Sequence, residues 1–226
     1  MKYSFVVVSY NRAEALGNCL YSIKIAEHYC LSAKLPTIEY EIIVVDDGSD
    51  KSVLTEIKRY CEGTQSKLIT NPHEVNLGKS LNQGVAMGSG TVLILLQQDY
   101  ILDPRFLWIL ETSGLPKPRT LCMPTMIRGF PHGREAKHWG IGDGVDSVFQ
   151  RADFIPFAED YPPLIYNHVY PEWLARMWFA PIEFVYVQNL MIYHQPHPEQ
   201  LQEIKKMTLE AKQAVFNKSN MQYYDR

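Results

Sequence analysis

Apolar residues follow two different patterns in the two halves of the chain. In the first half, short runs rich in Val, Ile and Leu alternate with longer segments whose apolar residues recur at helical spacing. The runs predict strands at 3–8, 40–45, 67–70 and 91–96. The helical spacing predicts helices at 13–29, 50–61 and 80–87. Strands that are apolar on both faces and separated by helices are typical of an α/β fold with a mainly parallel central sheet and helices on both faces.

The second half is interrupted by proline and glycine. Residues 115–170 contain only short apolar pieces, and we expect long loops there, of the kind that either belong to a site or are mobile. A helix is expected at 171–179, with proline in its first turn. Two short strands are expected after it, at 184–187 and 190–193.

No internal repeat or linker divides the main body of the chain. We therefore expect one domain at 1–197, made of two halves, 1–104 and 105–197. The segment 198–226 is polar with apolar residues at irregular helical spacing, and it is expected to form a helical tail.

Composition narrows the class of protein. The chain has 226 residues, 46% of them apolar, which is enough for one hydrophobic core. The net charge of −3 provides no basic field for nucleic acid. The apolar run after the first residues is too short for a signal sequence, and no segment approaches the roughly 20 apolar residues of a membrane span. Four widely spaced cysteines are typical of reduced thiols, so we expect a cytoplasmic protein, with contact to a membrane surface left open.

Polar clusters follow three of the predicted strands. In sheets of this kind, ligands bind beyond the carboxyl ends of the strands, which is where these clusters fall. The clusters are Ser9-Tyr10-Asn11-Arg12, Asp46-Asp47-Gly48-Ser49 and Gln97-Gln98-Asp99.

The pair Asp46-Asp47 has two interpretations. Asp, Gly and Ser form turns and cap helices, so the pair fits a simple turn. A carboxylate at a strand end can also accept the imide N–H of uracil or bind a ribose hydroxyl. Lys79 likewise fits a plain helix start, or a phosphate bound at a helix N-terminus.

Asp99 interrupts an apolar run. It has two interpretations, a turn cap or a metal ligand. Magnesium and manganese prefer oxygen ligands, and one carboxylate needs a second protein ligand beside it. His194 and His197 follow the last predicted strand and could provide that ligand. Mn²⁺ accepts mixed oxygen and imidazole ligation better than Mg²⁺.

Two acidic residues of the second half are candidates for a general base. Asp160 follows Glu159 in a loop, and Glu172 stands near a helix start, where the helix dipole alone explains an acid. The same half is rich in Tyr and Trp, which fits either a core or a groove on which carbohydrate stacks.

The order of these motifs resembles family 2 nucleotide-sugar glycosyltransferases of the A-type fold. The motifs are SFVVVSYNRAEAL, EIIVVDDGSD, NLGKSLNQG, LILLQQDYILDP and FVYVQNLMIYH. The resemblance covers roughly 3–104 well and 145–197 more loosely. It implies a Rossmann-like nucleotide-sugar-binding half, 1–104, and an acceptor and catalytic half, 105–197.

The resemblance also implies roles for single positions in nucleotide binding. Asp47 matches the acid that binds the base, and Asp46 is its neighbour. Lys79 stands where a helix start approaches the nucleotide. The loop that lines the nucleotide corresponds to Ser9, Tyr10, Asn11 and Arg12.

A metal motif of the form D-x-D is altered in this chain. Gln97 replaces the first acid, Gln98 is the spacer, and Asp99 is the second acid, which the resemblance makes the direct ligand of Mn²⁺ or Mg²⁺ on the diphosphate. His194 matches a late histidine that can complete the metal shell. Gln97 can still bond a hydroxyl.

The catalytic Glu-Asp pair of the family has no clear copy. Aligned through 175–187, the pair falls on Val169-Tyr170, and Glu172 follows one turn later. Asp160 fits the pair by type but stands too early. Glu172 and Asp160 both remain candidates for the base.

The implied activity is metal-assisted, inverting transfer of a hexosyl or deoxyhexosyl group from a nucleoside diphosphate sugar to a hydroxyl of a glycan or lipid-linked glycan, in polysaccharide biosynthesis. The alternative is a catalytically inactive nucleotide- or glycan-binding subunit of the same fold. A nucleotidyltransferase fits less well, because its first loop would be rich in glycine. Peripheral membrane contact and a homodimer both stay open.

Overall fold

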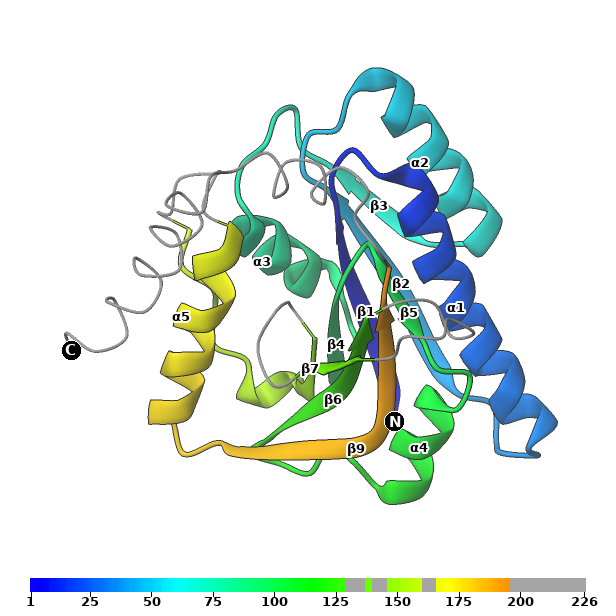
Figure 1. The fold of residues 1–226 in the computed structure, drawn as a ribbon, viewed down its shortest axis with the longest axis vertical. Coiled ribbons are helices and arrows are strands. Elements are labelled where there is room, and N and C mark those ends of the chain that lie inside the picture. Colours follow the sequence, from blue (N-terminus) through cyan, green and yellow to red (C-terminus); the bar gives the residue numbers. More distant parts are fainter. Residues whose placement is uncertain (129–136, 140–145, 160–165, 196–226) are drawn as a thin grey trace. The chain divides into compact units, whose positions relative to one another are not determined.

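The computed structural model describes residues 1–128, 137–139, 146–159 and 166–195. Met1–Gln195 forms one compact unit built around a nine-stranded mixed sheet (Figure 1). The expected tail, 198–226, lies outside the described residues, as do Asp160 and His197.

The sheet is mostly parallel, as the sequence predicts. Its order is β3-β2-β1-β4-β8-β6-β9-β5, and β7 pairs with β6. Strands β1 to β4 are parallel to one another, and β6 is parallel to β9. Strand β8 runs antiparallel between β4 and β6, and β5 runs antiparallel to β9. The bounds are β1 Lys2–Ser9, β2 Glu39–Asp46, β3 Lys67–Thr70, β4 Val92–Gln97, β5 Tyr100–Leu102, β6 Thr120–Arg128, β7 Lys137–Trp139, β8 Ser147–Gln150 and β9 Glu183–His194.

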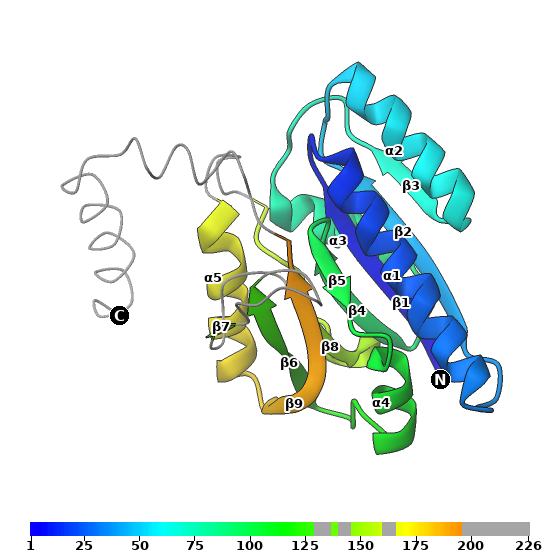
Figure 2. The same ribbon diagram turned by 45° about the vertical axis from the view of Figure 1, so that its right-hand side comes forward.

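Helices cover both faces of the sheet (Figures 1 and 2). Helices α1, α2 and α4 pack on one face, and α3 and α5 pack on the other. No helix in the described part of the chain is both long and apolar enough to cross a bilayer. The bounds are α1 Ala13–Ser32, α2 Lys51–Thr64, α3 Leu77–Met87, α4 Phe106–Ser113 and α5 Tyr166–Phe179, with a 3-10 turn at Arg151–Asp153.

Strand β1 shows why the sheet is buried on both sides. Tyr3, Phe5 and Val7 point into the core under α1, whereas Val6 and Val8 point into the core under α3. All five side chains are buried. Alternate residues of a strand face opposite sides, so an unbroken apolar run requires apolar cover on each face.

Three expectations for the second half are wrong. Residues 115–170 contain β6 and β8, two strands of the central sheet. Helix α5 begins at Tyr166 and has Pro171 inside it, although proline removes one helical hydrogen bond. The two short strands are one strand, β9, whose register against β6 shifts between Pro124 and Thr125.

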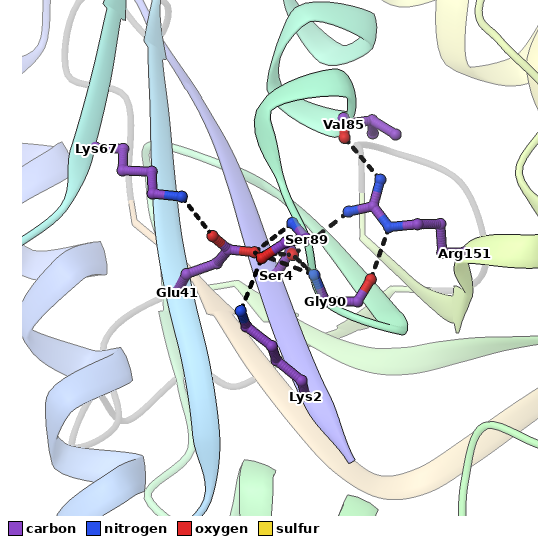
Figure 3. Close-up of polar contacts among 8 residues, drawn as sticks. All are labelled: Lys2, Ser4, Glu41, Lys67, Val85, Ser89, Gly90 and Arg151. Carbon is purple, nitrogen blue, oxygen red and sulfur yellow. Dashed lines mark hydrogen bonds and ion pairs between the residues drawn. The ribbon is translucent and has the colours of Figure 1, made fainter.

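A polar cluster closes the end of the sheet where β1 begins (Figure 3). Glu41 of β2 accepts hydrogen bonds from Ser4 Oγ at 2.8 Å and Lys67 Nζ at 2.7 Å. It also accepts bonds from the α3–β4 loop, from Ser89 Oγ at 2.9 Å and Gly90 N at 3.1 Å. We call these five residues the Glu41 cluster.

Arg151 holds the same loop from its other side. Its guanidinium donates to Val85 O at 2.7 Å and to Gly90 O at 2.6 Å (Figure 3). Burial lowers the pKa of Arg151, and the charge of Glu41 acts in the opposite direction. The α3–β4 loop is therefore fixed at the sheet end opposite the polar clusters that the sequence singles out.

Candidate active site

The register of the sheet brings the polar clusters together. Ser9 at the end of β1 pairs with Asp46 at the end of β2, and Val8 pairs with Gln97 at the end of β4. Three loops therefore leave the sheet side by side at its carboxyl edge. This is the place where parallel α/β sheets bind ligands.

Gln98 connects the loop after β4 to the loop after β1. Its side-chain oxygen accepts hydrogen bonds from Ser9 Oγ and Tyr10 N, both at 2.9 Å. Its side-chain nitrogen donates to Tyr10 O at 2.9 Å. One amide thus meets a donor and an acceptor of the same loop, which a carboxylate could not do because it lacks the donor.

Asn11 connects the loop after β1 to the loop after β2. Its backbone takes a positive φ of 50°, and its N–H donates to Ser49 Oγ at 2.9 Å. Its side-chain oxygen accepts from Asp50 N at 2.8 Å, at the start of α2. Asparagine tolerates this left-handed conformation better than most residues, so it fits the position.

The two adjacent aspartates point to different partners. Asp46 accepts hydrogen bonds from both the backbone N–H and the hydroxyl of Ser49. Asp47 accepts from Val75 N at 3.0 Å and from Ser80 Oγ at 2.8 Å, which joins the loop to α3. Burial raises the pKa of Asp46, although the bonds from Ser49 oppose the shift. The separate partners explain how two buried acids stand next to each other.

Gly48 follows the pair and has a positive φ of 89°. A Cβ atom at this position would lie 2.3 Å from the carbonyl carbon of His73. Only glycine therefore lets the loop after β2 pass this close to the backbone before α3.

Asp99 and His194 lie together, as the sequence reasoning expected of a metal-binding pair. His194 Nε2 is 3.2 Å from Asp99 Oδ2, and Arg12 Nη1 is 3.1 Å from the same oxygen. Asp99 is 2% exposed. A buried carboxylate needs a positive partner, and Arg12 supplies one from the start of α1.

The imidazole is held by strand pairing. Tyr100 and His194 are partners in the antiparallel pair of β5 and β9, and their rings meet edge to face at 5.4 Å. Gln195 N donates to Asp99 O at 2.8 Å, and Gln195 Nε2 donates to Ala15 O at 3.0 Å. The sequence analysis missed β5 and Gln195, because a three-residue strand gives no periodic signal.

Asp99 and His194 fit a divalent cation. They offer a carboxylate oxygen and an imidazole nitrogen, a mixed set that suits Mn²⁺. Among the described residues, no cluster of three or more Asp, Glu, His or Cys side chains could hold a metal. Two protein ligands would leave the other positions to diphosphate oxygens and water, which is usual for Mg²⁺ and Mn²⁺ on nucleotides.

Three further candidates lie on α3, α5 and β4. Lys79 is exposed in the first turn of α3, where its backbone N–H donates to Asn76 Oδ1 at 2.8 Å. Glu172 is bound on both oxygens by Arg176, at 2.7 and 3.0 Å. Gln97 is partly exposed at the end of β4.

A second acidic position at the carboxyl edge escaped the sequence analysis. Asp146 is 4% exposed and directly precedes β8. The same signal that singled out Asp99, an acid next to an apolar run, was present in GVDSVFQ. The glycines that precede Asp146 predict a loop, and this prediction hides the signal.

The fold matches that of A-type glycosyltransferases. Residues 4–110 match the model of Glycosyl transferase family 2. Similar solved structures include S. aureus TarS 1–349, with a TM-score of 0.64 and 16% identity over 90% of this chain and 63% of that one. The mannosyltransferase PcManGT from Pyrobaculum calidifontis, in complex with GDP-Man and Mn²⁺, has a TM-score of 0.63 and 12% identity over 85% of this chain and 56% of that one.

TarS 1–349 has also been solved with UDP and with UDP-GlcNAc. This chain spans less than two thirds of the length of each of these proteins, 63% of TarS 1–349 and 56% of PcManGT.

Proposed function

We propose that the protein is an inverting glycosyltransferase that moves a sugar from a nucleoside diphosphate sugar to an acceptor hydroxyl. The observation that carries the proposal is the pairing of Asp99 with His194 at the carboxyl edge, beside the loops that end β1 and β2. The ligands in TarS and PcManGT, UDP-GlcNAc and GDP-Man with Mn²⁺, support a sugar nucleotide as donor.

The nucleotide would lie over the loops at the ends of β1 and β2. Tyr10 offers an aromatic face there, and negative charges of Glu74, Asp50 and Asp47 lie close enough to act on its pKa, which is raised mainly by burial. Acidic side chains near a base favour nucleobases with an imide-type N–H, such as uracil and guanine, because a carboxylate can only accept. The other residues proposed for the nucleotide are Ser9, Asn11, Arg12, Asp46, Lys79, Gln97 and Gln98.

Asp99 and His194 would hold Mn²⁺ or Mg²⁺ against the diphosphate. The bound ion would neutralise charge on the departing nucleoside diphosphate, which is the largest electrostatic demand of the reaction. Arg12 adds a guanidinium beside it, which can pair with a phosphate oxygen.

A carboxylate takes the proton from the acceptor hydroxyl as that oxygen attacks the anomeric carbon from the face opposite the leaving group. The sequence proposes Glu172 or Asp160 for this role. The acceptor would be a glycan or lipid-linked glycan in polysaccharide biosynthesis, at the cytoplasmic side of a membrane.

A thermal-shift titration with UDP and GDP, each with and without Mn²⁺, tests the donor site. A ligand at a hundredfold excess over its Kd stabilises the folded state by about 2.7 kcal/mol, or roughly 5 to 10 °C for a chain of this size. We expect one of the two nucleotides to give such a shift with Mn²⁺ and Asp99→Asn to lose it.

Asp103→Asn is the matched control. Asp103 is also a buried aspartate held by an arginine, Arg105 at 3.0 Å, and it lies four residues away. An equal loss of the shift in both variants, or none in Asp99→Asn, would remove the metal role. Metal-dependent nucleotide binding without turnover of any sugar nucleotide would favour the inactive binding subunit.

A further inference from the structure

The start of β8 places an acid at the carboxyl edge of the sheet. Strand β8 runs antiparallel to β4, and Ser147 pairs with Leu95. Asp146, the residue before it, therefore lies beside Leu96. Because β8 runs in the opposite direction, its amino end meets the carboxyl ends of β1, β2 and β4.

Asp146 lies within reach of the proposed donor site. One strand spacing, roughly 5 Å, separates it from Leu96, and Asp99 follows Leu96 by three residues, at most roughly 11 Å of chain. The two Cα atoms are thus no more than roughly 16 Å apart. This upper limit places Asp146 and the Asp99–His194 pair at the same edge of the sheet, close enough for both to contact one bound sugar nucleotide.

The hydroxyl group of Tyr170 holds Asp146 in place. Tyr170 of α5 is 2% exposed, and its hydroxyl bonds to Ser147 Oγ and to both the carboxyl group and the backbone of Asp146. Burial raises the pKa of Tyr170, and the negative charge of Asp146 raises it further. Tyr170 therefore stays a neutral donor that fixes the carboxyl group of Asp146.

The Tyr170 ring is itself fixed. It stacks on Trp173 at 5.7 Å between ring centres, and Trp173 stacks on Phe157 at 4.7 Å. Trp173 Nε1 donates to Ile155 O at 2.6 Å. A carboxylate held through such a packed side chain is pre-positioned, which is what proton transfer in a transition state requires.

Glu172 is a poorer base in this structure. Both of its oxygens accept hydrogen bonds from Arg176, one turn later on the same helix. The bidentate guanidinium occupies both oxygens that would have to accept the proton of an acceptor hydroxyl.

We propose that Asp146 is the general base of the transfer and that Tyr170 is its positioning residue. The assignment rests on the proposed function. The acceptor O–H bond breaks and its proton passes to the carboxylate of Asp146. The acceptor oxygen forms a bond to the anomeric carbon, and the bond from that carbon to the diphosphate oxygen breaks, releasing the nucleoside diphosphate. Asp146 then returns the proton to solvent.

The test measures release of UDP or GDP from a panel of UDP- and GDP-sugars with Mn²⁺, using water as acceptor. We expect Asp146→Asn to lower kcat by at least about a hundredfold, the lower end of what a general base contributes. The thermal shift given by UDP or GDP with Mn²⁺ should stay within twofold of the wild-type value. Asp153→Asn, an acid of the same region that binds Arg119 N at 2.7 Å, is the matched control and should keep full turnover.

Tyr170→Phe removes only the hydroxyl and tests the same assignment if Asp146→Asn melts below the assay temperature. It should lower kcat about tenfold with an unchanged donor KM, as expected when a base is loosened without loss of donor contacts. A change in stability alone, with kcat unchanged in either variant, would overturn the assignment.

Two other results would count against Asp146. Loss of turnover in Glu172→Gln, with Asp146→Asn active, would give the role to Glu172 and leave the proposed function standing. Wild-type protein that binds UDP or GDP but turns over no sugar nucleotide would overturn the proposed function and, with it, this assignment.

Discussion

Replacing Glu41 by glutamine probes the electrostatics of the Glu41 cluster. The carboxylate is 10% exposed in its side chain and collects donors from β1, β3 and the α3–β4 loop (Figure 3). Burial would raise the pKa of Glu41. The bonds from Lys67, Ser89 and Ser4 outweigh burial and hold that pKa well below its usual range. The ionised form is therefore the one that the fold stabilises.

The size of the effect follows from the type of each bond. Glu41→Gln keeps the shape and one acceptor oxygen but loses the charge, and charge-assisted bonds are roughly twice as strong as neutral ones. Weakening the bonds from Ser4, Ser89 and Gly90 costs about 2 kcal/mol in total. Lys67 is half exposed, so its ion pair adds less than about 1 kcal/mol. We expect a loss of about 2 to 3 kcal/mol, or roughly 5 to 10 °C in Tm.

The loss should depend on pH with a definite sign. A glutamate in the unfolded chain has a pKa of about 4.3, and the folded-state pKa of Glu41 is lower. Its stabilisation is therefore complete above about pH 4.3 and declines by about 1.4 kcal/mol for each further unit of acidification, until the folded-state pKa is passed.

Urea denaturation of wild type and Glu41→Gln at several pH values from 3 to 7 measures this difference. Glu56→Gln is the matched control, because Glu56 forms a solvent-exposed ion pair with Arg59 and its loss should leave stability almost unchanged. A Glu41→Gln loss that is the same at pH 3 and pH 7, or no larger than that of the control, would refute the reasoning.

Three further changes test the site and the packing of the helices. Arg12→Gln removes the guanidinium from Asp99, so thermal shift should show a lower Tm without metal and a larger rise in Tm with Mn²⁺ alone than in wild type. Gly78→Ala places a Cβ atom 2.4 Å from Ala158 O, which should destabilise the protein by about 1 to 3 kcal/mol in urea denaturation. Gly63→Ala should instead raise stability by about 0.5 to 1 kcal/mol, because alanine favours a helix more than glycine does. Its Cβ atom would meet Tyr21 Oη at 3.7 Å, an ordinary contact distance.

The first half of the fold was predictable because each element depends on local pattern. Strand β3 matches its predicted bounds, and α1 and β2 begin within one residue of theirs. Helix α3 begins three residues earlier than predicted, because Asn76 caps it through Lys79 N. Apolar periodicity marks the body of a helix, whereas its first turn is set by a cap that has no periodicity.

The second half depends on pairings between distant segments. Strand β6 contains Pro124, a residue that argues against a central strand. The register shift lies directly after this proline, and Thr125 Oγ1 donates to Gln188 O at 2.8 Å within it. The local apolar pattern predicts two strands with a break at Gln188. The structure has one strand, β9, because a bulge in its pairing with β6 absorbs the irregularity.

Acids that directly follow a strand could be predicted as site residues from the sequence. The side chains that contact those acids from other elements could not. The family resemblance predicts that Asp99 and His194 lie together, and the structure brings them together. Their metal role stays a prediction. The contact of Arg12 with Asp99 and the contact of Tyr170 with Asp146 depend on side-chain directions that no spacing rule supplies.

The charge of Arg12 couples the binding of metal to the binding of diphosphate. Asp99 is almost completely buried, and Arg12 provides one positive charge beside it. A divalent ion entering alone would meet the guanidinium at close range. A diphosphate entering with the ion brings the negative charge that Arg12 can pair with. Metal and diphosphate should therefore bind together far more tightly than either binds alone.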